Sequence, residues 1–157
     1  FAAKSHYMMS PVYSLDQDET NTAIEKLQIF MNNYPKSKFV DECNQLISEL
    51  QNKIEKKEFE VAKQYYTIYD YRAAIKSLDN FVGEFVGSKY REEALYYKFL
   101  ASYEIAMNSI EAKKYQRLLD LKQLHDNITR YYPETLFEED LSKKIKTVEK
   151  EINTFVN

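Results

Sequence analysis

Histidine and cysteine, the side chains that most often bind metals or serve as base and nucleophile, are scarce in this sequence, which holds only His6, His125 and Cys43. A zinc site needs several such ligands at defined spacing, and a catalytic cysteine needs a base beside it. The three residues are widely separated and form neither pattern. We therefore expect no metal site, and a structural or surface role for His125.

Paired acidic residues are the next candidates, because two carboxylates in a cleft can act as general acid and general base. Three pairs stand where helices are expected to begin: Asp16 and Asp18, Glu92 and Glu93, Glu138 and Glu139. Negative charge at that end is explained by the helix dipole alone. With only Gly83 and Gly87 in the chain, a glycine-rich phosphate loop is also excluded. The sequence therefore predicts a protein that is not an enzyme and binds no cofactor.

Aromatic and basic residues at helical spacing give the pattern that most favours binding. If the small residues Val61 and Ala62 pack between helices, their neighbours project into a concave groove: Phe59, Lys63 and Tyr66. The equivalent positions of the next helix pair are Lys98, Ser102 and Ile105. Rigid rings beside charges suit an extended or helical peptide. The alternative is an idle, solvated helix face.

The loop over residues 10–20 is a second candidate contact. Its apolar part includes Tyr13 and Leu15, which is unusual for a solvent-exposed connection. Either this part packs on its own chain or it contacts a partner, and the sequence leaves both open.

Composition indicates which elements must position these residues. Average usage of about 7% glycine would give about eleven in 157 residues, but there are two, with three prolines. Sheets with many turns need more of both, so the chain is expected to be all-α. The net charge of −3 argues against binding nucleic acid. No apolar run approaches the length of about 18 residues that spans a membrane.

A repeat organises the helices. One set of residues recurs 51 positions later with the same or similar types: Ala23, Ile24, Leu27, Phe30, Tyr34, Ser37, Lys38 and Phe39. A third, weaker copy ends at Phe137. Such self-similarity is typical of stacked helix pairs, which present binding surfaces. We expect a single repeat domain over residues 1–157.

The apolar spacing predicts helices over residues 1–9, 21–33, 37–67, 70–82, 88–107 and 117–131, and a last one from Thr135. The segment 37–67 is expected to be one long helix, with two helices meeting near Lys56 as the alternative. Residues 108–116 are expected to form a loop or a helical extension. Gly83 and Gly87 are expected to supply left-handed backbone, and Thr135 with Glu138 a capping box.

Two sets of positions resemble the tetratricopeptide repeat: Ala23, Leu27, Phe30 and Pro35 in the first copy, and Val61, Ala62, Tyr65, Ala74, Leu78 and Phe81 in the second. The departures are Val86 in place of a proline and a period longer than the usual length of about 34 residues. A longer combination is similar to the BamD family, the outer-membrane assembly lipoproteins of the β-barrel assembly machinery: Phe59, Ala62, Tyr65, Tyr66, Tyr71, Ala73, Ala74, Ile75, Ser88 and residues 92–95. Residues 9–17 and 23–30 look like the form found in Bacteroidetes.

The resemblance implies a scaffold at the periplasmic face of the outer membrane, held there by an amino-terminal lipid. It implies protein partners: the periplasmic domains of the central barrel protein BamA, other assembly subunits, and unfolded outer-membrane proteins as further candidates. The signal, the lipid-bearing cysteine and about two early repeats of that family are not in this sequence, so we expect it to be a piece of a longer precursor.

Two other adaptor functions stay open. The first is another periplasmic tetratricopeptide adaptor of the cell envelope. The second is a cytosolic module that clamps a chaperone tail, for which Lys63 and Lys98 are present but the companion asparagines are not.

Overall fold

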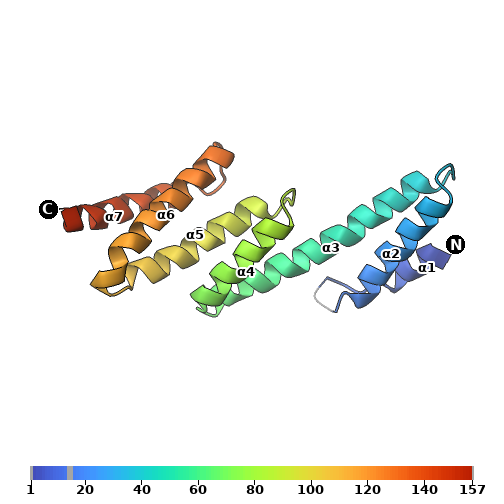
Figure 1. Ribbon diagram of the computed structural model, residues 1–157, viewed down its shortest axis with the longest axis horizontal. Helices are drawn as coiled ribbons and strands as arrows, with labels where there is room; N and C mark the ends of the chain where they lie inside the picture. Colours follow the sequence, from blue (N-terminus) through green and yellow to red (C-terminus); the bar gives the residue numbers. More distant parts are fainter. Residues whose placement is uncertain (1, 14–15, 157) are drawn as a thin grey trace. The chain divides into compact units, whose positions relative to one another are not determined.

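Every regular element in the described part of the chain, residues 2–13 and 16–156 of this computed structural model, is an α-helix. The helices are α1 (Ala2–Met9), α2 (Asp18–Asn33), α3 (Val40–Thr67), α4 (Tyr71–Glu84), α5 (Arg91–Met107), α6 (Glu111–Tyr131) and α7 (Glu138–Val156). Short turns join them, and consecutive helices pack on one another in antiparallel pairs (Figure 1). The prediction of an all-α array of tetratricopeptide-like helix pairs is confirmed.

Contacts divide the chain into two compact units, Phe1–Glu58 and Phe59–Asn157, and the boundary falls within α3. The expectation of one repeat domain stays a prediction. The segment predicted as one long helix is a single helix, α3. No helix in the described ranges is both long enough and apolar enough to span a bilayer.

Unit 1 is built on the side chains that α1, α2 and the first part of α3 bury together. The core residues are Ala3, Ala23, Leu27, Cys43, Leu46, Ile47 and Leu50. Ala23 is fully buried, and its small side chain lets α1 and α2 approach closely. Cys43 is also fully buried, and this burial raises the pKa of its thiol. The 3.6-residue spacing read from the sequence is therefore the spacing of the buried stripe.

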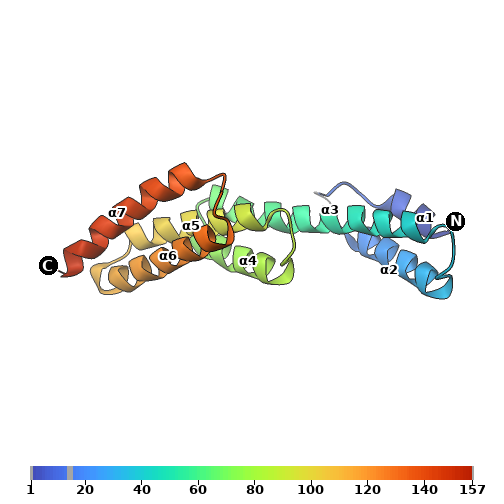
Figure 2. The same cartoon turned by 90° about the horizontal axis from the view of Figure 1, so that it is seen from above.

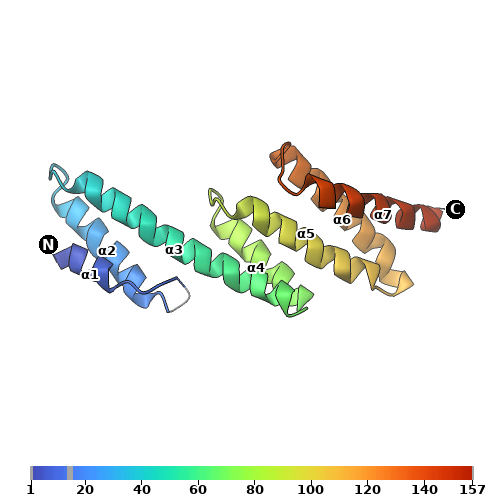
Figure 3. The same ribbon diagram turned by 180° about the vertical axis from the view of Figure 1, so that it is seen from behind.

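Unit 2 contains the last part of α3 and the helices α4 to α7 (Figure 2). One cluster packs α3, α4 and α5 around Phe59, Leu78 and Phe81. A second packs α5, α6 and α7 around the Phe99 ring and five buried aliphatic side chains: Leu118, Leu121, Ile128, Leu141 and Val148. Helices α6 and α7 form the last pair of the chain (Figure 3). Each helix of the unit thus buries one stripe against its neighbours.

Several helix ends differ from those predicted. Helix α2 begins three residues early, at Asp18, and α6 begins at Glu111, so the helical alternative holds for residues 111–116 despite their polarity. Neither glycine has a positive φ, so the prediction of left-handed glycines is wrong. The capping box is only half formed: Thr135 Oγ1 accepts from the amide of Phe137 at 3.3 Å and its hydroxyl donates to Glu92 Oε1 at 2.7 Å, whereas Glu138 Oε1 accepts from Ser142. Thr135 thus caps the start of α7 and also binds α5 through Glu92.

Candidate partner-binding groove

Unit 2 contains an open groove of about 280 Å³ between α4, α5 and α6. We call it the α4–α6 groove and define it by its lining residues: Ile75, Lys98, Ser102, Ile105, Arg117, Asp120, Leu121 and Leu124. The three positions that the repeat assigned to α5, Lys98, Ser102 and Ile105, all line it. The sequence reasoning missed the walls from α4 and α6, because no local pattern tells which helices enclose a groove.

The charged side chains of the α4–α6 groove have partners within the chain. Lys98 Nζ lies 2.5 Å from Asp79 Oδ1. Arg117 donates to the Ser109 hydroxyl, and Gln116 donates to Asp120 at 2.8 Å. Between these groups lie the aliphatic side chains of α4, α5 and α6. The groove is therefore suited to an apolar peptide side chain, with polar groups at its rim setting orientation.

Lys63 is not a groove cation but an inter-helix ion pair. Its Nζ donates to Glu93 Oε1 at 3.0 Å and lies 4.9 Å from the centroid of the Tyr97 ring. Burial alone would lower the pKa of Lys63, but the hydrogen bond and the charge of Glu93 outweigh it and raise the pKa overall. Lys4 pairs with Glu42 in the same way at 2.7 Å. Glu42 and Glu93 each stand three residues after a turn aromatic, so the acidic partner of these ion pairs recurs with the repeat.

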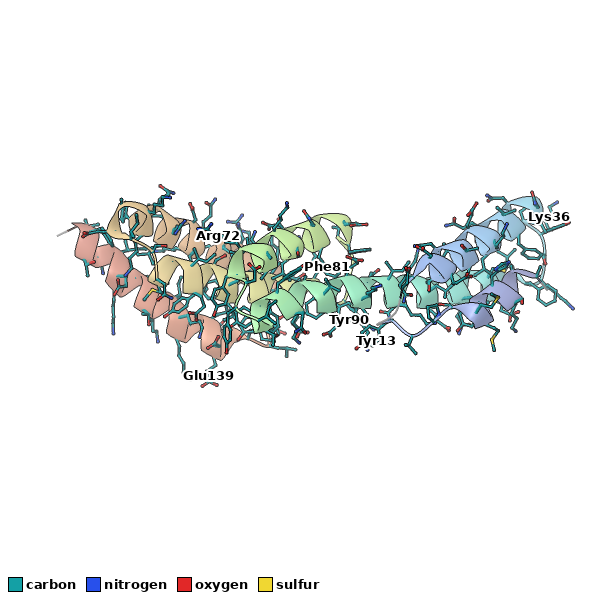
Figure 4. All side chains as sticks on the ribbon, turned by 90° about the horizontal axis from the view of Figure 1, so that it is seen from below. Tyr13, Lys36, Arg72, Phe81, Tyr90 and Glu139 are labelled. Carbon is teal, nitrogen blue, oxygen red and sulfur yellow. The ribbon has the colours of Figure 1, made fainter. Side chains whose placement is uncertain are left out.

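Phe59 is a core residue, and the expectation that it projects into an open groove is wrong. Its side chain is 1% exposed, and its ring stacks on Tyr90 with centroids 5.3 Å apart and planes 12° from parallel. Figure 4 shows Phe81 and Tyr90 beside the helices of this core. Val61, expected to pack between helices, is instead 45% exposed. The buried stripe of α3 runs through Phe59 and Ala62, so Ala62 packs inward as expected, whereas Phe59 and Val61 exchange the sides expected of them.

Tyr66 is half-buried and joins the two clusters of unit 2. Its ring centroid lies 5.3 Å from that of Tyr97 and 5.7 Å from that of Tyr71. Burial, followed by the nearby charge of Glu104, raises the pKa of its hydroxyl. The contacts that the structure shows are packing contacts, as are those of the other tyrosines predicted to pack between helices: Tyr65, Tyr90, Tyr97 and Tyr103.

The loop before α2 is tied to its own unit. Gln17 Nε2 donates to the carbonyl of Val12 at 3.0 Å, and the Thr20 hydroxyl donates to Gln17 Oε1 at 2.6 Å. Tyr13 lies at the surface of this loop (Figure 4), with Lys56 Nζ 4.0 Å from its ring centroid. Leu15 lies outside the described residues. The described part of the loop thus packs on its own chain, and a partner contact at Tyr13 and Leu15 stays a prediction.

A second hollow, of about 620 Å³, lies at the α2–α3 turn of unit 1. Its lining is mainly apolar: Phe30, Asn33, Tyr34, Pro35, Lys36, Ser37 and Phe39. Tyr34 is 60% exposed, and Lys36 lies at the tip of the turn (Figure 4). The sequence reasoning missed this hollow because it used Tyr34 and Pro35 only as positions of the repeat.

The described residues that line the two hollows include one carboxylate, Asp120, and neither histidine nor cysteine. Within residues 2–13 and 16–156, no three His, Cys, Asp or Glu side chains lie close enough together to hold a metal ion. The His125 side chain is 15% exposed, and its ring centroid lies 6.2 Å from that of Phe99. These surfaces can bind a partner by shape, apolar contact and peripheral charge.

The comparisons with known proteins agree with this description. No curated protein matches the chain. One family model, described as YfiO, outer membrane lipoprotein, matches residues 2–118 and again residues 63–154. The overlap of the two matches is what a repeated helix pair produces. The first match alone spans more than half of the sequence, and the chain belongs to the YfiO family of outer membrane lipoproteins.

Proposed function

We propose that this protein is a non-enzymatic, BamD-type scaffold subunit of the β-barrel assembly machinery, at the periplasmic face of the outer membrane. The family match is the single observation that carries this proposal. The partners are the periplasmic domains of the central barrel protein BamA and other assembly subunits, and unfolded outer-membrane proteins are further candidates. The lipid anchor, the periplasmic location and the Bacteroidetes type belong to the same proposal.

The α4–α6 groove is the surface we propose for a partner segment. Ile105 and Leu124 face the groove beside Leu121, whose burial ties the groove to the core of unit 2. Helices stacked on such a core hold a surface in shape before a partner arrives, which lowers the ordering cost of binding. Lys98 stays at the rim as an oriented charge. Binding in the groove would thus use apolar contact for affinity and Lys98 for orientation.

The test measures binding of the full-length protein to the purified periplasmic domains of BamA from the same organism. Ile105→Ala with Lys98→Ala is expected to weaken binding at least about tenfold, because it removes both the apolar contact and the rim charge. Ile110→Ala, at a 68% exposed position that does not line the groove, is the matched control and is expected to bind as the wild type does.

Two results would count against the proposal in different ways. If the wild-type protein does not bind the BamA domains, the assembly function is wrong, and another envelope adaptor function takes its place. If the double variant keeps its helical content and its affinity, the groove is the wrong surface while the function remains.

A further inference from the structure

The turn between α3 and α4 has a tyrosine, Tyr69, at the left-handed position that ends a helix, where glycine is the usual residue. Tyr69 has φ of 65°, the one positive φ in the described part of the chain. The amides of Tyr69 and Asp70 donate to the carbonyls of Tyr66 and Tyr65 at 3.0 and 2.9 Å. These two bonds are the Schellman closure of a helix, whose left-handed residue is usually glycine because a Cβ atom there is unfavourable.

Packing does not explain the tyrosine. The Tyr69 side chain is 78% exposed and the adjacent Ile68 is 57% exposed. Neither belongs to the core of unit 2. The ring meets Tyr71 edge-on, with centroids 6.3 Å apart. The fold thus tolerates an unfavourable backbone conformation and gains little buried area from the ring, a combination that indicates a role at the surface.

The exposed pair stands on a well-packed base. Tyr71, which Tyr69 contacts, lies 5.7 Å from Tyr66 between ring centroids, and Tyr66 lies 5.3 Å from Tyr97. The Asp70 carboxylate accepts from the amide of Ala73 at 3.1 Å and so starts α4 immediately after the turn. Ile68 and Tyr69 are therefore held in place before any partner binds, which reduces the entropy lost on binding.

The surroundings of the pair are acidic. Asp70 follows it directly, and Glu104 lies close enough that, after burial, its charge is the next cause raising the pKa of Tyr71. The last turn of α3 has no basic residue. Arg72 is the cation nearest in sequence, and Figure 4 shows it on α4. A complementary partner surface would be basic.

We propose that Ile68 and Tyr69 insert as a knob into an apolar pocket, bordered by Lys or Arg, on a protein partner. The inference rests on the proposed scaffold function and adds a second surface to it, which shares no residue with the lining of the α4–α6 groove. A tyrosine is well suited to this position because its large ring buries much area for few rotatable bonds.

Photo-cross-linking in cells tests the knob without assuming the partner. Three strains each produce the full-length protein with benzoylphenylalanine at one position. The positions are Tyr69, Ile105 in the α4–α6 groove, and Tyr131, a 64% exposed aromatic residue that serves as the control. Position 69 is expected to give one protein adduct that position 131 lacks. The cross-linked peptide, mapped by mass spectrometry, is expected to lie at apolar residues flanked by Lys or Arg.

A second variant separates binding from folding. Tyr69→Gly is expected to leave the melting temperature unchanged or higher, and to weaken binding of the cross-linked protein, once purified, at least about tenfold. Tyr131→Ala is expected to leave that binding unchanged. A fall of several degrees in the melting temperature of Tyr69→Gly would overturn the inference, because the ring would then serve the fold.

Each outcome of the cross-linking is decisive. No adduct at position 69, adducts only to lipid or to a second copy of the chain, or the same scattered adducts as at position 131 would overturn the knob. An assembly subunit captured at position 105 alone leaves the proposed function standing without the knob. A protein captured at position 69 with the expected pocket, but from outside barrel assembly, supports the knob and contradicts the proposed function.

Discussion

A single carboxylate, that of Asp140, joins α5 to α7. The Tyr96 hydroxyl donates to Asp140 Oδ2 at 2.9 Å, and Lys144 Nζ donates to Oδ1 at 2.9 Å. Burial alone would raise the pKa of Asp140, but the bonds from Lys144 and Tyr96 outweigh it and lower the pKa overall. The Tyr96 ring also stacks on Phe137, with centroids 4.0 Å apart. The start of α7 is therefore fixed by a charge and a stack together.

We expect Asp140→Asn to destabilise the protein by about 1 kcal/mol at pH 7, a value reduced because the pair is partly exposed. A carboxyl whose pKa is lower in the folded state stabilises the fold above its ordinary pKa, and this contribution is lost as the pH falls through the folded value. The difference between wild type and variant should therefore shrink below about pH 4. Urea unfolding at several pH values measures it.

Glu139→Gln is the matched control for Asp140→Asn. Glu139 also pairs with a lysine four residues on, Lys143, at 2.6 Å, but both side chains are largely exposed (86% for Glu139 and 71% for Lys143). Figure 4 shows Glu139 pointing away from the helices. Its loss should change stability by less than about 0.5 kcal/mol. Equal effects of the two substitutions would contradict the role given to Tyr96.

Among the elements, α4 contains an avoidable weakness. Gly83 lies inside the helix with a negative φ, and a Cβ atom built there meets no atom within 4 Å. Gly83→Ala is expected to stabilise the protein by about 0.5–1 kcal/mol, since alanine loses less backbone entropy in a helix. Thermal unfolding followed by circular dichroism measures the shift.

Gly87 provides the comparison, because it lies in the turn after α4 and also has open space at its Cβ position. Gly87→Ala should stabilise the protein by no more than about 0.4–1 kcal/mol, because its only effect is to reduce the conformational entropy of the unfolded chain. A loss of stability in Gly83→Ala would show that the helix needs a glycine there, as the sequence reasoning had assumed.

Helices were predictable where periodicity or turn residues decide them. The unbroken apolar steps of α3 gave one long helix, and Asp70 gave the start of α4. The start of α6 was left open, as a loop or a helical extension, because residues 111–116 carry too few apolar side chains to show a period, and the structure has the helix. The left-handed conformation of Tyr69 was missed because glycine is the residue that usually adopts it.

For the candidate binding groove, the sequence could predict only which residues of one helix share a face. Repeat register placed Lys98, Ser102 and Ile105 together, and they do line one groove. The same register placed Phe59 of α3 outward, although its ring packs on Tyr90 in the α4–α5 turn. Glu93 was explained by the helix dipole, and its bond to Lys63 depends on which helices stack. Contacts between helices lie beyond local pattern.

At the scale of the whole molecule, the two compact units set how the protein opens. In a helical repeat, stability is a sum of local terms, so unfolding can begin in one part. Leu27→Ala in the fully buried core of unit 1 should cost about 2–5 kcal/mol locally. Amide hydrogen exchange should then speed up in α2, with smaller changes in α5 and α6.

Leu118→Ala, at a fully buried position in unit 2, is the reciprocal variant, and its exchange should speed up in α5 to α7 instead. If either variant accelerates exchange equally along the whole chain, the two units unfold as one cooperative body and the independence expected here is wrong.

The burial of Cys43 makes opening of unit 1 visible without engineering. It is the only thiol in the sequence, it is fully buried, and this burial raises its pKa. A maleimide dye would therefore react only in molecules whose α2 and α3 have separated. The labelling rate of the unmodified protein, alone and with a partner bound, would report how strongly that partner clamps the first unit.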